Sequence, residues 1–272
     1  LINCVPDCKL PDDRSIHYGH RALGNGEIYF VSNQTTETKM ITPEFRVKGM
    51  QPELWEAVTG YIRDLPAYDQ KENTTAVPVK LEPYESVFVV FRKTAGKASA
   101  SGVDSNYPAP ALIADLKGPW TVNFNASQRG PEEPVVFETL KDWTTSQDDR
   151  IKYYSGTAFY NCKFKLEKLP ASEQVIINLG KITAMAKVTV NGTYAGGVWT
   201  APYRLDITKL IKEGENELKI EVVNTWVNRL IGDSKIPVGQ RLTWCPVNTY
   251  TPASALQPSG LTGPVSILSV KY

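Results

Sequence analysis

The sequence predicts an all-β protein in which an N-terminal β-sandwich is followed by a jelly roll. Apolar and polar residues alternate in many short segments, turn residues separate these segments, and no long segment shows the 3.6-residue apolar period of a helix. One stretch rich in Ala, Ser, Gly and Pro has little to bury and is typical of a linker. We therefore assign residues 1–95 to an Ig-like β-sandwich, 96–110 to the linker and 111–272 to the jelly roll.

Six strands are predicted in the first domain, and turn residues such as Gly24-Asn25-Gly26 separate them. The segment 51–54 is also compatible with a single turn of helix. The predicted strands lie at residues 27–33, 39–48, 54–58, 61–64, 76–81 and 86–92.

The second domain has longer strands. The clearest is the segment 156–166, in which Ala158, Tyr160, Cys162, Phe164 and Leu166 alternate with more polar residues and should face inward. Strands of this kind, repeated along the domain, fit a jelly roll. The further predicted strands lie at residues 120–125, 134–138, 174–179, 186–191, 217–223 and 265–270.

Composition excludes several classes of function. The chain is 42% hydrophobic and 22% charged, with a formal net charge of +1. Such a balance argues against a nucleic-acid partner, which requires a strongly basic face. No apolar run approaches the ~20 residues of a membrane span, so we expect no membrane insertion. Because the chain begins at Leu1, we expect a processed or truncated polypeptide.

Four cysteines are too few to build a disulfide scaffold for a chain of this length. Cys4 and Cys8 are close enough in sequence to pair with each other or to join a metal site. Cys162 lies on the inward face of its strand, where a buried free thiol is expected, although pairing with Cys245 is an alternative. The sequence leaves the disulfide state of all four open.

The two histidines of the chain, His17 and His20, precede Arg21 in one short segment. We expect His17, His20 and Arg21 to face a neighbouring domain, with ordinary structural hydrogen bonding as the alternative. A site made with the two N-terminal cysteines matches no common zinc spacing, so no metal site is assigned.

The segment 187–224 reads KVTVNGTYAGGVWTAPYRLDITKLIKEGENELKIEVVN. Asn191-Gly192 between alternating runs predicts a tight hairpin, and Asp206–Thr208 predicts a polar corner before the next strand. This order of motifs resembles the galactose-binding-like jelly-roll domain that accompanies family 2 glycoside hydrolases. The resemblance implies a carbohydrate partner and supplies no catalytic group.

Further strings resemble the C-terminal part of glycoside hydrolase family 106, a family of bacterial α-L-rhamnosidases. They are IHYGHRALGNGEIYFVSN at 16–33, EFRVKGMQPELWEAVTG at 44–60, IKYYSGTAFY at 151–160 and VNTWVNRLIGD at 223–233. The resemblance implies a secreted or periplasmic bacterial protein that processes plant-type, rhamnose-containing polysaccharide. It also implies that the catalytic carboxylates lie on an upstream (β/α)8 barrel.

A barrel of that kind needs ~250 residues of alternating strands and helices, which this chain lacks. We therefore expect no catalytic residue and no activity from this chain alone. An upstream catalytic domain is the expected partner if the native protein is longer. No cofactor is expected, and the sequence leaves open whether a calcium ion braces the jelly roll.

Carbohydrate sites combine an aromatic platform with convergent polar groups. Two segments offer that mixture. The first is the loop after the strand 217–223, and the second precedes the Asp206–Thr208 corner. Alternatively, the tryptophans belong to the core, and an ion pair between Arg229 and Asp233 stabilises the loop. The second segment would then serve only to form the Asp206–Thr208 corner. The candidate residues are Trp226, Asn228, Arg229, Asp233, Arg241 and Trp244 in the loop, with Trp199 and Tyr203 in the second segment.

The expected function is that of a non-catalytic accessory or carbohydrate-binding region of a secreted glycoside hydrolase. One alternative is a structural role in bracing a catalytic barrel, which predicts an exposed apolar patch near the N-terminus. A stand-alone lectin-like protein is another, and it predicts a cleft around Trp226 and Trp244. An independent hydrolase would need two carboxylates facing each other in a pocket.

Overall fold

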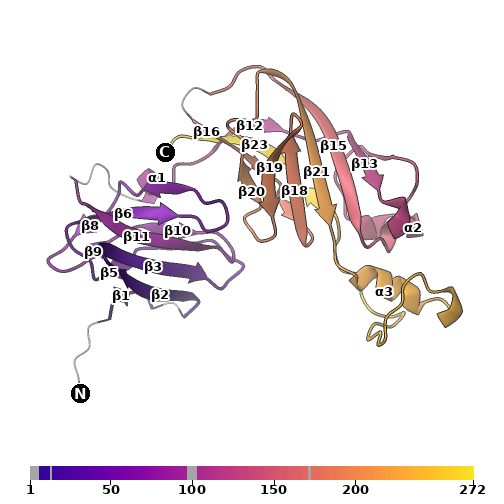
Figure 1. Cartoon of the computed structure of the whole chain (residues 1–272), viewed down its shortest axis with the longest axis horizontal. Helices are drawn as coiled ribbons and strands as arrows, with labels where there is room; N and C mark the ends of the chain where they lie inside the picture. Colours follow the sequence, from indigo (N-terminus) through magenta and orange to yellow (C-terminus); the bar gives the residue numbers. More distant parts are fainter. Residues whose placement is uncertain (1–5, 13, 97–102, 171–172) are drawn as a thin grey trace. The chain divides into compact units, whose positions relative to one another are not determined.

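The computed structural model describes residues 6–12, 14–96, 103–170 and 173–272 (Figure 1). Its regular structure is almost entirely antiparallel β-strand, which confirms the all-β prediction. The chain divides into two compact units. One comprises residues 1–110 with 270–272, and the other comprises 111–269.

The first unit is built on a five-stranded sheet with the order β2-β3-β11-β6-β7. A four-stranded sheet, β1-β5-β9-β8, and the pair β10-β4 complete it. Tyr29 and Phe91 from the first sheet pack against Phe45 from the second, with ring centroids 4.7 and 5.4 Å from that of Phe45. The strands are β1 (Cys8–Lys9), β2 (Ile16–Leu23), β3 (Gly26–Asn33), β4 (Lys39–Ile41), β5 (Glu44–Phe45), β6 (Met50–Trp55), β7 (Ile62–Asp64), β8 (Asp69–Gln70), β9 (Thr75–Ala76), β10 (Val79–Leu81) and β11 (Ser86–Thr94).

Several local predictions for this unit differ from the structure: the segment 76–81 is two strands, β9 and β10, and the segment 54–58 contains only the end of β6. The edge strand β2 was missed because most of its residues are exposed and it lacks an apolar alternation. The segment 39–48 is two short strands separated around Pro43, whose missing N–H cannot join a ladder. The segment 51–54 lies in β6 and is not a helical turn, because β11 and β7 pair with it on either side.

The predicted linker contains ordered structure. Residues 97–102 lie outside the described part of the chain, but α1 (Val103–Asn106) follows directly. The buried amide of Asn106 donates to the carbonyl oxygens of Ala67 (2.8 Å) and Pro78 (2.9 Å) and accepts from Ala67 N (2.8 Å). The short helix is therefore attached to the first unit by side-chain hydrogen bonds that no local sequence pattern indicates.

The last residues of the chain also belong to the first unit. The guanidinium carbon of Arg63 lies 5.0 Å from the ring centroid of Tyr107 and 4.3 Å from that of Tyr272. This cation–π sandwich brings together three segments that are distant in sequence.

The second unit packs two main sheets face to face around one core (Figure 1). One sheet has six strands in the order β14-β13-β15-β21-β18-β19, and the other has four in the order β12-β23-β16-β20. The strands are β12 (Ala111–Asp115), β13 (Trp120–Phe124), β14 (Val135–Phe137), β15 (Thr157–Leu166), β16 (Gln174–Asn178), β17 (Lys181–Ile182), β18 (Met185–Val190), β19 (Thr193–Val198), β20 (Arg204–Asp206), β21 (Gly214–Val223), β22 (Leu261–Gly263) and β23 (Ser266–Val270). Short helical segments join them: η1 (Ala126–Gln128), η2 (Trp143–Thr145), α2 (Asp149–Lys152), α3 (Val227–Ser234) and η3 (Val238–Gln240).

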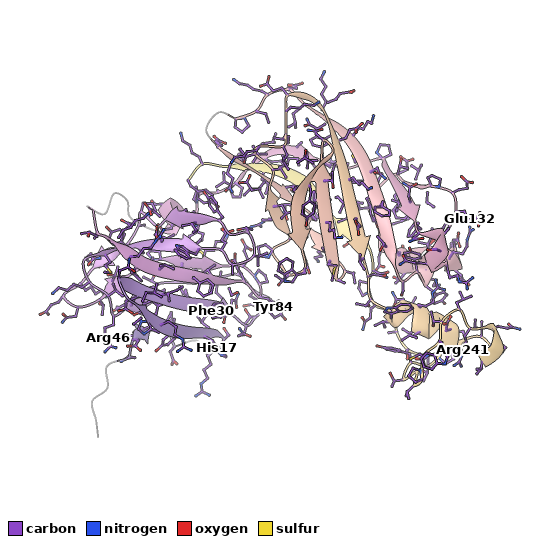
Figure 2. All side chains as sticks on the ribbon, in the orientation of Figure 1. His17, Phe30, Arg46, Tyr84, Glu132 and Arg241 are labelled. Carbon is purple, nitrogen blue, oxygen red and sulfur yellow. The ribbon has the colours of Figure 1, made fainter. Side chains whose placement is uncertain are left out.

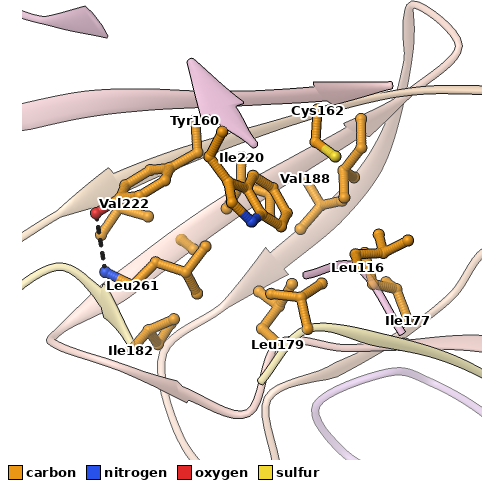
Figure 3. Packing of buried hydrophobic residues seen from close by; sticks show 14 of the residues in the cluster. Leu116, Tyr160, Cys162, Ile177, Leu179, Ile182, Val188, Ile220, Val222 and Leu261 are labelled. Atoms are coloured by element: carbon orange, nitrogen blue, oxygen red, sulfur yellow. Dashed lines mark hydrogen bonds between the residues drawn. The ribbon is translucent and has the colours of Figure 1, made fainter. Parts of the chain in front are cut away.

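The core of this unit follows the alternation seen in the sequence. Ala158, Tyr160 and Cys162 of β15 are buried and pack with side chains of the neighbouring strands (Figure 3). Burial raises the pKa of the Cys162 thiol. Cys162 and Cys245 are both free thiols, so they do not form the alternative disulfide. Cys8 is also free and buried, whereas Cys4 lies outside the described residues.

The Asn191-Gly192 hairpin joins β18 to β19, as predicted. Both residues have positive φ (51° and 80°), as a type I′ turn requires. The Asn191 side chain donates to Leu210 O and to Asn216 Oδ1, each at 2.8 Å, and accepts from Glu217 N at 2.9 Å. Asn191 therefore fixes the turn and also ties it to the loop before β21.

Candidate functional site

A long excursion between β21 and β22 carries most of the candidate site. We call residues 225–260 the arm; they include α3 and η3, and Figure 1 shows α3 beyond the end of β21. Ser155 Oγ donates to Thr225 O (2.8 Å) where the arm leaves the sheet. Asn248 Nδ2 donates to Leu230 O (3.0 Å), which holds the loop after η3 against the helix.

Two of the predicted polar residues stabilise the arm from inside. Asn228 is buried; its amide donates to Gln257 O (2.7 Å) and accepts from Gln257 N (2.9 Å). Asp233 is also buried, and its carboxylate accepts from Leu242 N (3.3 Å) and from Thr243 N (2.9 Å) and its hydroxyl. Both side chains are buried and form hydrogen bonds with the backbone of the arm. They are therefore not exposed to bind a ligand.

Arg229 occupies a different position in the arm. It is 5% exposed, and its Nη2 atom has no hydrogen-bond partner among the described residues. Burial lowers the pKa of Arg229, while the carboxylate of Asp233 acts in the opposite direction. Arg229 and Asp233, which were considered as an ion pair, therefore interact only electrostatically within α3.

Several large apolar side chains of the arm are exposed. Trp226 is 62% exposed and Trp244 is 87% exposed. Arg241 is also exposed, and Figure 2 shows it on the arm near α3. Three aliphatic side chains of the arm are exposed as well: Val238, Leu242 and Val247. The arm thus offers aromatic platforms, while Arg241 is the exposed polar member of the predicted set in the loop.

The second predicted segment separates in the structure. Trp199 is 59% exposed after β19, whereas Tyr203 packs against the core and its carbonyl accepts from Leu179 N at 2.9 Å. The Asp206 carboxylate accepts from Thr208 N (2.8 Å) and Thr208 Oγ1 (2.5 Å). Although burial opposes it, these hydrogen bonds lower the pKa of Asp206 and hold the corner.

In the first unit, His20 makes more side-chain contacts than the other two predicted interface residues. Its ring stacks on Tyr29 at 4.3 Å and 11°, with Nε2 2.7 Å from Glu27 and Nδ1 3.2 Å from Asp7. A hydrogen bond with His20 lowers the pKa of Asp7. His17 Nε2 lies 3.1 Å from Arg14 O, and Arg21 is exposed. Their role towards another domain stays a prediction.

Among the described residues, no group of three or more His, Cys, Asp or Glu side chains is arranged to hold a metal ion. Within the same residues, no helix has the length and apolar character needed to cross a membrane.

The sequence did not reveal a hollow of about 580 Å³ in the second unit. It lies on the outer face of the six-stranded sheet, where the side chains that alternate with the core residues point. Its lining includes Thr121, Asn161, Lys163, Thr189, Glu217 and Lys219. These outward positions were visible in the alternation, but their assembly depends on pairing between distant strands.

Comparisons with known proteins agree with both resemblances. Residues 1–70 match the family 106 model described as alpha-L-rhamnosidase. Residues 140–249 match the model described as glycosyl hydrolase 2 galactose-binding domain-like. The whole chain is similar to a solved rhamnosidase from Novosphingobium sp. PP1Y, with a TM-score of 0.88 and 38% identity. The resemblance to family 106 is confirmed.

The matched region is a small part of each relative. It covers 98% of this chain but 25% of the Novosphingobium rhamnosidase. A protein of Formosa agariphila named "Putative beta-glucuronidase" is 35% identical over 212 residues, which are 69% of this chain and 18% of that protein. The chain therefore carries glycoside hydrolase-related β-domains and spans a quarter or less of these relatives.

Proposed function

We propose that this chain is a non-catalytic region of a bacterial glycoside hydrolase and that it braces the catalytic part of that enzyme. We also propose that the enzyme works outside the cytoplasm on rhamnose-containing polysaccharide. The matches to α-L-rhamnosidase and to a galactose-binding-like domain support this class of protein. The secreted location and the substrate rest on the resemblance alone.

One observation carries the bracing role: the arm exposes Trp226 and Trp244, whereas Asn228 and Asp233 are buried. A sugar site needs polar groups that converge on hydroxyls beside an aromatic platform. On the arm, Asn228 and Asp233 bond the backbone instead, while Trp226 and Trp244 stay exposed. Exposed tryptophans and other large apolar side chains are enriched on surfaces that contact protein.

A second apolar surface lies on the first unit. Phe30, Phe88, Trp55 and Ile62 are successive cross-strand neighbours on the outer face of the five-stranded sheet. The Phe30 and Phe88 ring centroids are 5.3 Å apart, and Phe30 (Figure 2) is exposed. Ile62 is exposed as well. This apolar row is the kind of patch that a bracing role predicts in the N-terminal domain.

The structural contacts of three carboxylates, Asp142, Asp148 and Glu53, support a non-catalytic role. Glycosidic cleavage requires two carboxyl groups that flank the bond. Asp142 and Asp148 cap short helices through Thr144 N and Arg150 N, and Glu53 is paired with Arg92. We therefore expect the chain alone to release no sugar from rhamnosides, and measurable hydrolysis would overturn this part of the proposal.

Site-specific photo-cross-linking tests the bracing role in the full polypeptide that the native gene encodes. A photoreactive residue in place of Trp244 should cross-link to segments outside residues 1–272, whereas one in place of the exposed Glu132 should not. Cross-links from position 244 that stay within residues 1–272 would argue against the arm as a contact surface.

Carbohydrate binding by the arm is the rival explanation for its tryptophans. It predicts that rhamnose-containing oligosaccharides protect tryptophan fluorescence from acrylamide quenching and that Trp226→Ala or Trp244→Ala removes the protection. The bracing role predicts that the oligosaccharides protect tryptophan fluorescence neither in the unmodified chain nor in the two variants. The two explanations are thus separated by one titration on the chain itself.

A further inference from the structure

The outer face of the six-stranded sheet carries a polar row that crosses five strands. Thr121, Asn161, Lys219, Thr189 and Tyr194 are successive Cα partners on β13, β15, β21, β18 and β19. Paired residues in antiparallel strands point to the same face, with Cβ atoms about 5 Å apart. The row therefore forms a continuous band about 19 Å long, at roughly 4.8 Å per strand.

The band has the chemistry of a carbohydrate site. Thr121 and Thr189 offer hydroxyl groups that both donate and accept, as sugar hydroxyls require. Asn161 offers its Oδ1 atom as an acceptor, while its Nδ2 atom donates to Thr121 O (3.3 Å) and Phe159 O (3.4 Å). Tyr194 is 62% exposed at the end of the row and provides an aromatic face. The hollow of about 580 Å³ lies within the range of about 300–1,000 Å³ found for small-molecule sites.

The charges on this face are unevenly compensated. Lys163 Nζ is 2.8 Å from Glu217, and Lys187 Nζ is 3.6 Å from Glu221. Lys219 has no carboxylate within 4 Å in the described part of the chain. Its Nζ instead lies 4.5 Å from the ring centroid of Phe159. The centre of the row thus holds an exposed lysine that makes no ion pair within 4 Å with a described carboxylate.

We propose that this sheet face binds an oligosaccharide that carries a uronate carboxylate. Lys219 pairs with the carboxylate, Asn161 and the two threonines bond the hydroxyls, and Tyr194 packs on a ring. The galactose-binding domain-like match at residues 140–249 includes four of the five strands in the row, which favours a sugar over other anions. The site adds ligand binding to the proposed accessory role and does not depend on the arm.

Isothermal titration of the folded chain with two matched probes tests this assignment. One probe is a galacturonate tetramer, and the other is the same tetramer with every carboxylate methyl-esterified. The acid should bind more tightly than the ester, and raising the salt concentration from about 0.05 to 0.5 M should weaken the acid alone. Lys219→Met should weaken binding of the acid about tenfold, the usual scale of one charge-assisted hydrogen bond.

Lys187→Met is the matched control, because it removes a lysine of the same face that already has a carboxylate partner. It should change the affinity less than twofold, as exposed ion pairs contribute little. Asn161→Ala should weaken both probes. Circular dichroism and thermal melting verify that each variant folds. If Lys219→Met does not fold, Lys219→Gln replaces it.

Three results would overturn the proposal: no binding of either probe, equal binding of acid and ester, or equal effects of the Lys219 and Lys187 substitutions. None of these results bears on the cross-links expected from Trp244. Failure of the sheet site and failure of the bracing role are therefore distinguishable.

Discussion

The Tyr160 hydroxyl is the most informative single group to remove from the second unit. It lies in the core and accepts a hydrogen bond from Trp143 Nε1 at 2.6 Å. It also accepts one from Leu261 N at 3.2 Å (Figure 3). Trp143 belongs to η2 and Leu261 to β22, so one oxygen joins three segments that are distant in sequence. Tyr160→Phe removes that oxygen and keeps the ring, so the packing of the core changes little.

The expected cost follows from the two donors left behind. Both N–H groups would stay buried without an acceptor, and each such group costs about 1–3 kcal/mol. We expect the free energy of unfolding to fall by about 3 kcal/mol. For a domain of about 150 residues, that corresponds to a decrease in Tm of roughly 6–12 °C.

Guanidinium unfolding followed by tryptophan fluorescence measures the effect, since Trp120 and Trp143 lie in this core. Tyr194→Phe is the control, because its hydroxyl is on an exposed side chain. It should change stability by less than about 0.5 kcal/mol. If Tyr160→Phe differs from Tyr194→Phe by no more than that amount, the idea that one hydroxyl satisfies both buried donors is wrong.

Three further predictions concern intramolecular contacts of Glu53, Arg63 and Asp233. Burial raises the pKa of Glu53, but hydrogen bonds from Arg92 and a neighbouring lysine outweigh it, so the folded pKa lies below the unfolded value. Its stabilisation should be present above the unfolded pKa of about 4.3 and be lost as the pH falls, and Glu53→Gln should flatten the acid limb of a stability–pH curve. Arg63→Ala should lower the stability of the first unit by about 1–2 kcal/mol in denaturant titrations, with Arg63→Lys retaining part of the cation–π interaction; equal losses would contradict this. Asp233→Ala should speed tryptic cleavage after Arg241 several-fold because the loop loses its carboxylate acceptor, and an unchanged cleavage rate would refute that role.

The parts of the fold that sequence reasoning predicted are local ones. The alternation in 156–166 identified β15 and its buried face, and Asn191-Gly192 identified the β18–β19 hairpin. These succeed because strand alternation and turn geometry depend on residues within a few positions. The edge strand β2 was missed for the complementary reason: it forms through pairing with β3, and its own residues show no buried stripe.

The candidate site shows the same division. Composition and motif order selected the right segment, since the arm does carry exposed aromatic side chains. Sequence could not distinguish Asn228 and Asp233, which turn inward, from Trp226 and Trp244, which face outward. Whether Asn228 and Asp233 turn inward depends on whether backbone groups of distant residues, such as Gln257 and Thr243, pack against α3 and form hydrogen bonds with them.

The sequence by itself determined the all-β class, the hairpin, the alternating core strand and the resemblance to rhamnosidase β-domains, because each depends on neighbouring residues. Only the tertiary structure decided that Thr121, Asn161, Lys219 and Thr189 form one row, and that Lys219 lacks a carboxylate partner within it. Strands far apart in the chain are brought together by burial of their inner faces against the second sheet. The outer face that results from this pairing has an order of side chains that no single segment contains.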